Sequence, residues 1–375
     1  MRRAIVLVAL LGCPKAQEGR RVPAVEAPTP PEAPTPKPPN PETPPRPSWR
    51  AGWSEENGTL DRPEERWGVT LGGPITAPVL ADTTQVYAVA DGRIAAFSLD
   101  GKRIWEVQLP GVQGAALAGE SIVAGGDDGR VHFFDRATGK EKTATERGGP
   151  LVGAPVAIDG GWAWVTEEGA VVSNAGWLYA VGKSPMGRPA ADESTVYVAT
   201  RDGTLMAVGP KGVEWQVKLP GPPTDGPALD EDNVYVSLAA DGGEPGGVVA
   251  YGRWGPLLAK ERWRFRSEFQ PLAAVGADVD TVYVPDKDGN VYALGADDGS
   301  RRWNSEGYGE FSTQPLVTKG SVFVGNSDGH LTRLDTYDGG RAWSIDLGAP
   351  VTGEPVIVGG AIFVGLANGR LIALE

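Results

Sequence analysis

The sequence repeats one short pattern eight times, from about residue 73 to its last residue. Each copy holds two apolar runs joined by a tight turn that contains glycine, as in Val86–Phe97 with Asp91-Gly92 at the turn. Asp-Gly or Asn-Gly between such runs predicts a β-hairpin, and a type I′ turn needs positive φ at both turn residues. The eight turn glycines are Gly92, Gly129, Gly169, Gly203, Gly247, Gly289, Gly329 and Gly369.

The spacing of these glycines, 34 to 44 residues, fixes the size of the repeating unit. That length is typical of one four-stranded propeller blade. The chain has 53 glycines among 375 residues, which agrees with many tight turns. We therefore expect an all-β chain whose residues 51–375 form an eight-bladed β-propeller of four-stranded antiparallel blades.

Tryptophan marks the end of most units and indicates how the ring closes. Five copies follow a turn glycine by 12 to 16 residues: Trp105, Trp215, Trp263, Trp303 and Trp343. They are expected to pack between neighbouring blades. The last unit lacks such a strand, whereas Glu65–Leu71, with Trp67, precedes the first unit. Because an open ring would expose two sheet edges, this N-terminal strand is expected to complete blade eight.

The N-terminus has the features of a lipoprotein precursor. Residues 1–12 combine a basic start with the apolar run Ala4–Leu11, which predicts a secretory signal peptide. Leu10–Cys13 matches a lipobox, so Cys13, the only cysteine, is expected to carry diacylglyceryl and palmitate-type acyl chains. Since Pro14-Lys15 lacks an acidic retention signal, we expect the outer membrane, with the domain facing the periplasm.

Residues 13–50 are expected to be a linker. Proline occupies 12 of the 25 positions from Pro23 to Pro47. Such a segment favours an extended polyproline II spacer of about 3.1 Å per residue. The formal net charge of −13 argues against a nucleic-acid partner, because phosphate binding needs a basic surface. We expect a monomeric propeller held on a membrane by its lipid.

The sequence offers little for catalysis or metal binding. His132 and His330 fall in different units and lack the spacing of a zinc site. No nucleophile stands in a recognisable catalytic arrangement. The aspartates before the turn glycines are attributed to the turn backbone, which favours them. We therefore predict no enzyme, no cofactor and no metal.

Blade five is the best candidate for a partner-binding site. It carries the glycine-rich insertion Asp241–Gly247, followed by Tyr251, Arg253 and Trp254. Exposed Tyr, Arg and Trp side chains dominate interface energies. We expect these three residues to contact a partner on the face that carries the inter-blade connections. The alternative is a flexible glycine loop.

The repeat resembles that of the pyrroloquinoline-quinone-type propeller family. The copy most similar to it contains Asp288-Gly289, the run Val291–Leu294 and Trp303. One branch of the family, the quinoprotein dehydrogenases, holds a quinone and calcium in the propeller centre. Membership of that branch would imply an adjacent cysteine pair, which this chain lacks.

A second branch comprises the propeller lipoproteins of the machinery that inserts β-barrels into the outer membrane. Resemblance to this branch implies a scaffold with envelope proteins, including the assembly complex, as partners. The segment Leu219–Asp232 lacks the Arg-Leu element of that branch's partner-contacting loop. We expect a non-enzymatic cell-envelope scaffold. A quinone-dependent dehydrogenase or another ligand-binding propeller is the alternative.

Overall fold

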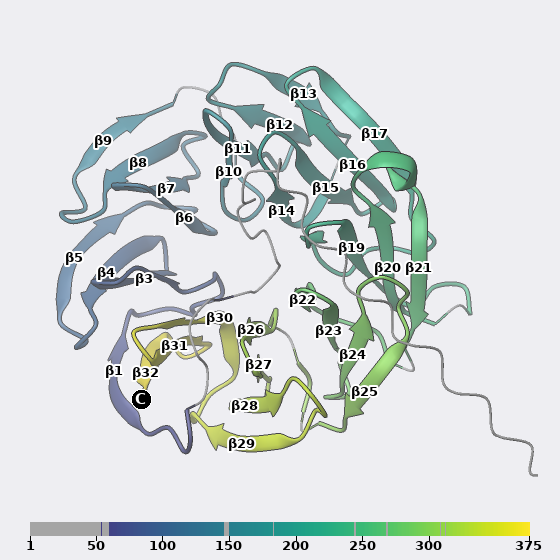
Figure 1. Ribbon diagram of the computed structural model, residues 1–375. Coiled ribbons are helices and arrows are strands. Elements are labelled where there is room, and N and C mark those ends of the chain that lie inside the picture. Colours follow the sequence, from purple (N-terminus) through teal and green to yellow (C-terminus); the bar gives the residue numbers. More distant parts are fainter. Residues whose placement is uncertain are drawn as a thin grey trace, which may run out of the picture. The chain divides into compact units, whose positions relative to one another are not determined.

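The computed structural model describes Ser54 and residues 60–375, except 146–149, 183, 244, 268, 308 and 312. In this part of the chain, 32 strands form eight four-stranded antiparallel sheets arranged as a ring (Figure 1). The expected all-β eight-bladed propeller is confirmed. The signal peptide, Cys13 and the linker lie outside the described residues.

Blades one to four are each built from four consecutive strands. Blade one has β2 (Leu80–Ala81), β3 (Gln85–Ala90), β4 (Arg93–Ser98) and β5 (Arg103–Gln108). Blade two has β6 (Ala115–Ala118), β7 (Ser121–Gly125), β8 (Val131–Asp135) and β9 (Glu141–Ala144). Blade three has β10 (Val156–Ile158), β11 (Gly161–Val165), β12 (Ala170–Ser173) and β13 (Leu178–Ala180). Blade four has β14 (Pro185–Ala191), β15 (Val196–Thr200), β16 (Thr204–Gly209) and β17 (Gly212–Lys218).

Blades five to seven repeat this plan, and blade eight combines both ends of the propeller sequence. Blade five has β18 (Ala228–Leu229), β19 (Asn233–Leu238), β20 (Gly247–Gly252), the 3-10 helix η1 (Gly255–Leu257) and β21 (Glu261–Arg266). Blade six has β22 (Gly276–Ala277), β23 (Thr281–Pro285), β24 (Val291–Gly295) and β25 (Arg301–Ser305). Blade seven has β26 (Leu316–Thr318), β27 (Ser321–Gly325), β28 (His330–Asp335) and β29 (Arg341–Asp346). Blade eight has β30 (Val351–Val358), β31 (Ala361–Leu366), β32 (Arg370–Leu374) and β1 (Glu65–Thr70).

Burial differs between the middle and outer strands of a blade. All six residues of β19 and of β20 are buried, because the middle strands are covered on both faces by neighbouring blades. The outer strand β1 instead alternates between exposed and half-buried residues. This arrangement explains why the apolar runs in the sequence do not alternate with polar residues, as they would in a sheet covered on one face.

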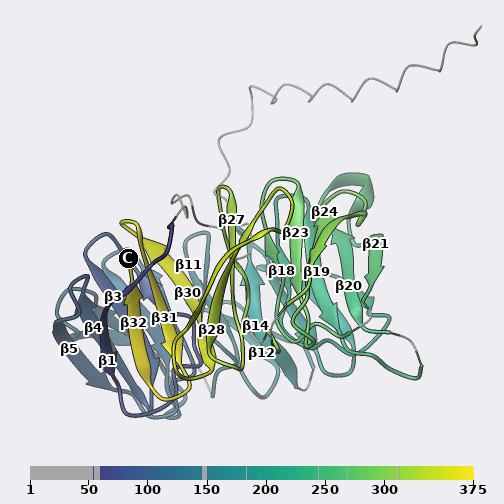
Figure 2. The ribbon, with the colours of Figure 1, turned by 90° about the horizontal axis from the view of Figure 1, so that it is seen from below.

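The connections fall at two opposite ends of the strands, which Figure 2 shows from the side. One end, called here the inter-blade end, carries the turns between second and third strands and the connections between blades, such as residues 109–114. The opposite end, called the outer-turn end, carries the other turns, such as residues 82–84 and 99–102. This division follows from the antiparallel order of the four strands.

The turns at the inter-blade end differ in part from the expected type I′ geometry. Asp91 (φ 49°) and Gly92 (φ 68°) both have positive φ, as that turn requires. In blade six, Gly289 has φ 84° whereas Asp288 does not have positive φ, and the Asp286 amide donates to the Asn290 carbonyl. A three-residue connection with one left-handed glycine makes the same reversal. The type I′ prediction is therefore wrong for Asp288-Gly289.

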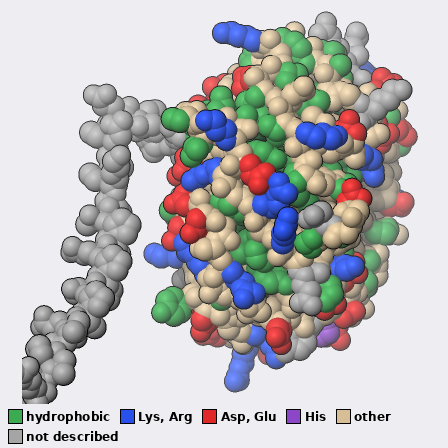
Figure 3. Space-filling model, turned by 90° about the vertical axis from the view of Figure 1, so that its right-hand side faces the viewer, with side chains coloured by type: hydrophobic (Ala, Val, Ile, Leu, Met, Phe, Trp, Pro, Cys, Tyr) green, Lys and Arg blue, Asp and Glu red, His purple; other side chains and the backbone are tan. Residues whose placement is uncertain are grey.

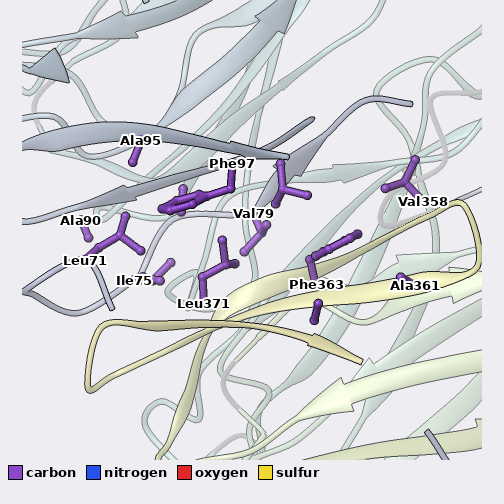
Figure 4. Close-up of a cluster of buried hydrophobic side chains, with 13 residues drawn as sticks. Leu71, Ile75, Val79, Ala90, Ala95, Phe97, Val358, Ala361, Phe363 and Leu371 are labelled. Atoms are coloured by element: carbon purple, nitrogen blue, oxygen red, sulfur yellow. The ribbon is translucent and has the colours of Figure 1, made fainter. Parts of the chain in front are cut away.

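The N-terminal strand closes the ring as expected. β1 pairs with β32 in antiparallel register, with Trp67 opposite Ala373 and Val69 opposite Leu371. The cluster of buried residues beside this pairing draws side chains from both blade eight and blade one, including Phe363 and Phe97 (Figure 4). The predicted closure by the Trp67 strand is confirmed.

Tryptophans of the outer strands join neighbouring blades. Trp67 of blade eight donates its indole N–H to the Leu99 carbonyl of blade one (2.8 Å) and lies over Gly101. A Cβ at Gly101 (φ +80°) would approach Trp67 Cδ2 to 2.6 Å, so this turn requires glycine. The same bond joins three further pairs at 2.8 to 2.9 Å: Trp105 to Arg136, Trp263 to Ala296 and Trp303 to Thr336. Trp343 donates to the Leu60 carbonyl (2.6 Å). No turn joins the third and fourth strands of blade eight, because these are β32 and β1, from opposite ends of the propeller sequence.

Candidate functional site

Blade five departs from the repeat at the outer-turn end. The connection between its third and fourth strands spans residues 253–260, whereas the equivalent connection in blade six spans residues 296–300. This longer connection holds η1 and is called here the blade-five loop. It lies beside blade four, where a short glycine turn would otherwise receive Trp215.

Arg253 fixes this loop to blade four. Its guanidinium donates to the Asp192 carboxylate (2.5 Å) and to the Asp230 backbone carbonyl, and 1% of Arg253 is exposed. It also lies over the Tyr197 ring, 5.6 Å from the centroid. A buried ion pair with further hydrogen bonds is rigid, and losing one partner destabilises the fold strongly. Burial raises the pKa of Tyr197, which therefore stays protonated.

The expectation that Tyr251, Arg253 and Trp254 are all exposed is wrong. Tyr251 and Arg253 are buried, at 4% and 1%, while Trp254 is 43% exposed. Tyr251 lies in a middle strand, which neighbouring blades cover on both faces. A direct role in partner binding therefore remains a prediction for Trp254, with Arg253 as its support: the guanidinium lies 4.9 Å from the Trp254 ring.

The insertion and Trp254 also lie at opposite ends of blade five. Residues 241–246 join β19 to β20 at the inter-blade end, and the blade-five loop joins β20 to β21 at the outer-turn end. Their closeness in sequence hides this separation, because β20 crosses the whole blade. At the inter-blade end, Asp241 lines a hollow of about 280 Å³ together with Arg201 and Lys218. The prediction of one shared face is wrong.

A second candidate site is the centre of the ring, where opposite blades meet through an ion pair. Arg188 belongs to β14 of blade four, and Glu354 to β30 of blade eight. Each lies in a register irregularity of its strand, a bulge that turns its side chain toward the axis. The guanidinium donates to the Glu354 carboxylate and to Gln314 (3.1 Å). This pair crosses the channel.

The chemistry of this channel does not fit a quinone and calcium. The hollow measures about 360 Å³, and the described residues lining it include one cation, Arg188, two carboxylates, Asp225 and Glu354, and no aromatic ring. A polyanionic quinone needs several cations and a flat apolar floor. Both carboxylates are already engaged, Glu354 by Arg188 and Asp225 by the Gly226 and Ala274 amides. Burial raises the pKa of Glu354, Arg188 opposes the rise, and Asp225 adds to it.

The two histidines lie in different blades. His132, in β8, contacts Asp128 (3.1 Å) and Glu141 (3.3 Å). His330 begins β28 of blade seven. Among the described residues, no group of three or more His, Cys, Asp or Glu side chains is placed to hold a metal ion.

Sequence reasoning missed Arg188 and Glu354, although the repeat contains a signal for both. Each precedes a proline near the start of an inner strand, where other units have the uncharged residues Ala77, Ala154, Gly226 or Gln314. A charged side chain at a position that is uncharged in these other units marks a departure from the repeat. Reading the units against one another would have found it.

The fold defines an eight-bladed propeller of quinone-type repeats, and the described lining of its channel does not fit the quinone. A family model described as outer membrane protein assembly factor BamB matches residues 60–156, 156–252 and 257–375. The chain belongs to this family. A search of the curated proteins found no significant match.

Solved structures share the fold at low sequence identity. BamB from Moraxella catarrhalis is 16% identical, with a TM-score of 0.67 over 84% of this chain and 98% of that one. The computationally designed Ika8 protein is 17% identical, with a TM-score of 0.69 over 86% and 99%. A europium-containing methanol dehydrogenase is 14% identical, with a TM-score of 0.61 over 88% and 98%. In the described part of the chain, no helix is long and apolar enough to span a membrane.

Proposed function

We propose that this chain is a non-enzymatic scaffold of the bacterial cell envelope that binds other envelope proteins, including those that assemble outer-membrane proteins. The observation that carries the proposal is the family match, which runs through nearly the whole propeller. The channel supports it, because the Arg188–Glu354 pair occupies the place where a cofactor of the dehydrogenase branch would lie.

The proposal includes a lipid anchor on Cys13, with residues 1–12 removed as a signal peptide and residues 13–50 acting as a spacer. The sequence supports this part, through the lipobox Leu10–Cys13 and the proline-rich segment. A propeller with short connections offers a large rigid surface, and the spacer would hold that surface away from the membrane. The expected location is the periplasmic face of the outer membrane.

The test is a pull-down of the lipidated chain from bacterial envelopes, read by mass spectrometry. We expect outer-membrane assembly proteins among the specific partners. The Cys13→Ser variant should leave the membrane fraction and appear in the soluble fraction. If wild type recovers no envelope protein, or if purified chain oxidises alcohols with added quinone and calcium, the scaffold function is wrong. If Cys13→Ser still sediments with membranes, the lipid anchor is wrong.

A further inference from the structure

The blade-five loop presents three large apolar side chains at the outer-turn end. Trp254, Leu257 and Leu258 are 43%, 46% and 45% exposed. Val279, in the first turn of blade six, is 69% exposed. Trp254 and Val279 both lie next to Glu231, because the Trp254 indole donates to its carbonyl (2.7 Å) and Val279 lines a hollow with it. The three exposed side chains of the loop, Trp254, Leu257 and Leu258, are called here the blade-five patch, and Val279 lies near its Trp254 end.

The loop under this patch is held in place by several contacts. Leu258 forms a β-bridge with Gly252, and Arg253 joins the start of the loop to blade four. Ala259 has φ 58°, a left-handed conformation that is strained for a non-glycine residue. Exposure of these apolar side chains to water would not by itself require a fixed loop. The fixed backbone instead keeps them ordered for contact, which reduces the entropy lost on binding.

An acidic hollow borders the patch between blades five and six. Its volume is about 30 Å³, and its described lining holds five acidic residues and no Lys or Arg: Asp230, Glu231, Asp232, Asp278 and Asp297. Arg262 pairs with Asp297 at its edge (3.0 Å). Figure 3 shows basic and acidic side chains interspersed over the side of the ring that carries β21. The described lining of the hollow is therefore acidic, whereas the surface in Figure 3 carries both charges.

We propose that the blade-five patch and this acidic hollow form one docking surface for a partner protein segment in which apolar residues adjoin Lys or Arg. The apolar side chains of the segment would cover Trp254, Leu257 and Leu258. Its basic side chains would lie against Glu231 and Asp232, since complementary charge selects the partner and speeds association. The proposal rests on the scaffold function and names the chemistry of its partner.

Site-specific crosslinking in cells tests the surface. A photoreactive phenylalanine analogue is placed at position 257 of the full chain and, as the control, at Leu178, which is similarly exposed (52%) on blade three. We expect an adduct specific to position 257, whose crosslinked peptide contains apolar residues adjoining Lys or Arg. Equal adducts at both positions, an acidic peptide, a second copy of this chain, a lipid, or no specific adduct would each overturn the proposal.

Variants separate the two halves of the surface. In the presence of the position-257 analogue, Trp254→Ser with Leu258→Ser should reduce the adduct about tenfold, because central aromatic anchors carry most binding energy. Glu231→Gln with Asp232→Asn should also reduce it and should weaken its dependence on salt. Ile104→Ser, an exposed residue of blade one (45%), should leave it unchanged. If the pull-down keeps its envelope partners in all variants, the docking surface is wrong and the scaffold function stands.

Discussion

Two contacts between neighbouring blades show how far this ring departs from its own repeat. Between blades eight and one, Trp67 lies over Gly101 and donates one hydrogen bond to a carbonyl, as tryptophans do at three further contacts. Between blades four and five, the buried Arg253–Asp192 pair joins the blades, and a longer loop replaces the glycine turn. The first contact is repeated around the ring. An ion pair at the equivalent place, Arg136–Asp82 (3.3 Å), also joins blades one and two, but there the short glycine turn is kept and Trp105 lies over Gly139. Among the described connections, the pair is fully buried and the turn is replaced by a longer loop between blades four and five alone.

The difference indicates which parts of the propeller serve stability and which are available for function. Where a tryptophan packs on a glycine turn, its ring is covered and only a short connection remains at the surface. At the Arg253 contact the guanidinium is buried, and the loop that follows it exposes Trp254, Leu257 and Leu258. Places where a local rule is broken and compensated are the best functional candidates. Two experiments test whether the two contacts differ as this view requires, and a third compares them with the ion pair of the channel.

The largest effect is expected at the contact between blades eight and one. Removing residues 1–71 should lower the free energy of unfolding by roughly 3–5 kcal/mol or more relative to removing residues 1–50. The longer truncation exposes the edge of β32 and removes the packing of Trp67. Urea denaturation of the two truncated chains measures the difference. Equal midpoints would show that the β1 pairing contributes nothing to the ring.

An intermediate effect is expected at the contact between blades four and five. Arg253→Met should lower the free energy of unfolding by about 3 kcal/mol, because Asp192 keeps its burial (2% exposed) and loses its cation. The matched variant Trp254→Ser should cost less than about 1 kcal/mol, since its ring is partly in water. Thermal and urea unfolding measure both. Similar losses for the two variants would contradict the division into support and exposed surface.

The smallest effect is expected in the channel. Burial raises the pKa of Glu354 in the folded chain above its unfolded value, so the folded state takes up a proton first as pH falls. This group therefore favours folding most below its unfolded pKa, and that contribution is lost as pH rises through the folded pKa. We therefore compare the free energy of unfolding of wild type with that of Glu354→Gln. As the pH falls from neutral to about 4.5, this free energy should rise in wild type relative to the variant by about 1 kcal/mol or less. Urea titrations at several pH values measure it, and a difference independent of pH would contradict it.

The fold could be predicted because its signals are local. Each turn glycine and each tryptophan of the outer strands acts within one blade or on the next, so their spacing gave eight blades and the closure by Trp67. The burial of Arg253 could not be predicted in this way. Its partner Asp192 lies 61 residues earlier, and Asp82, Asp230 and Asp278 stand at the same place in their blades, so the local sequence does not single out this pairing.

The candidate sites were predicted only in part for the same reason. Trp254 was found from its residue type, but its neighbours Leu257, Leu258 and Val279 were not, because apolar residues in a β-rich chain are normally buried. Arg188 and Glu354 lie in opposite blades and meet through bulges in two inner strands. A bulge shifts a side chain by one position, which a strict period of two cannot anticipate.

The tryptophan contacts have a consequence for how such a ring can change over evolutionary time. A blade that offers both a tryptophan and a glycine turn fits beside any other blade of that kind, so duplication or exchange of one unit preserves the contacts on both sides. Blades four and five are different, because their Asp192–Arg253 pair is fully buried, whereas the equivalent Asp82–Arg136 pair of blades one and two is partly exposed to water. A new blade inserted between them would leave Asp192 and Arg253 each buried without its charged partner. The buried pair therefore constrains the order of the blades most strongly at this one point.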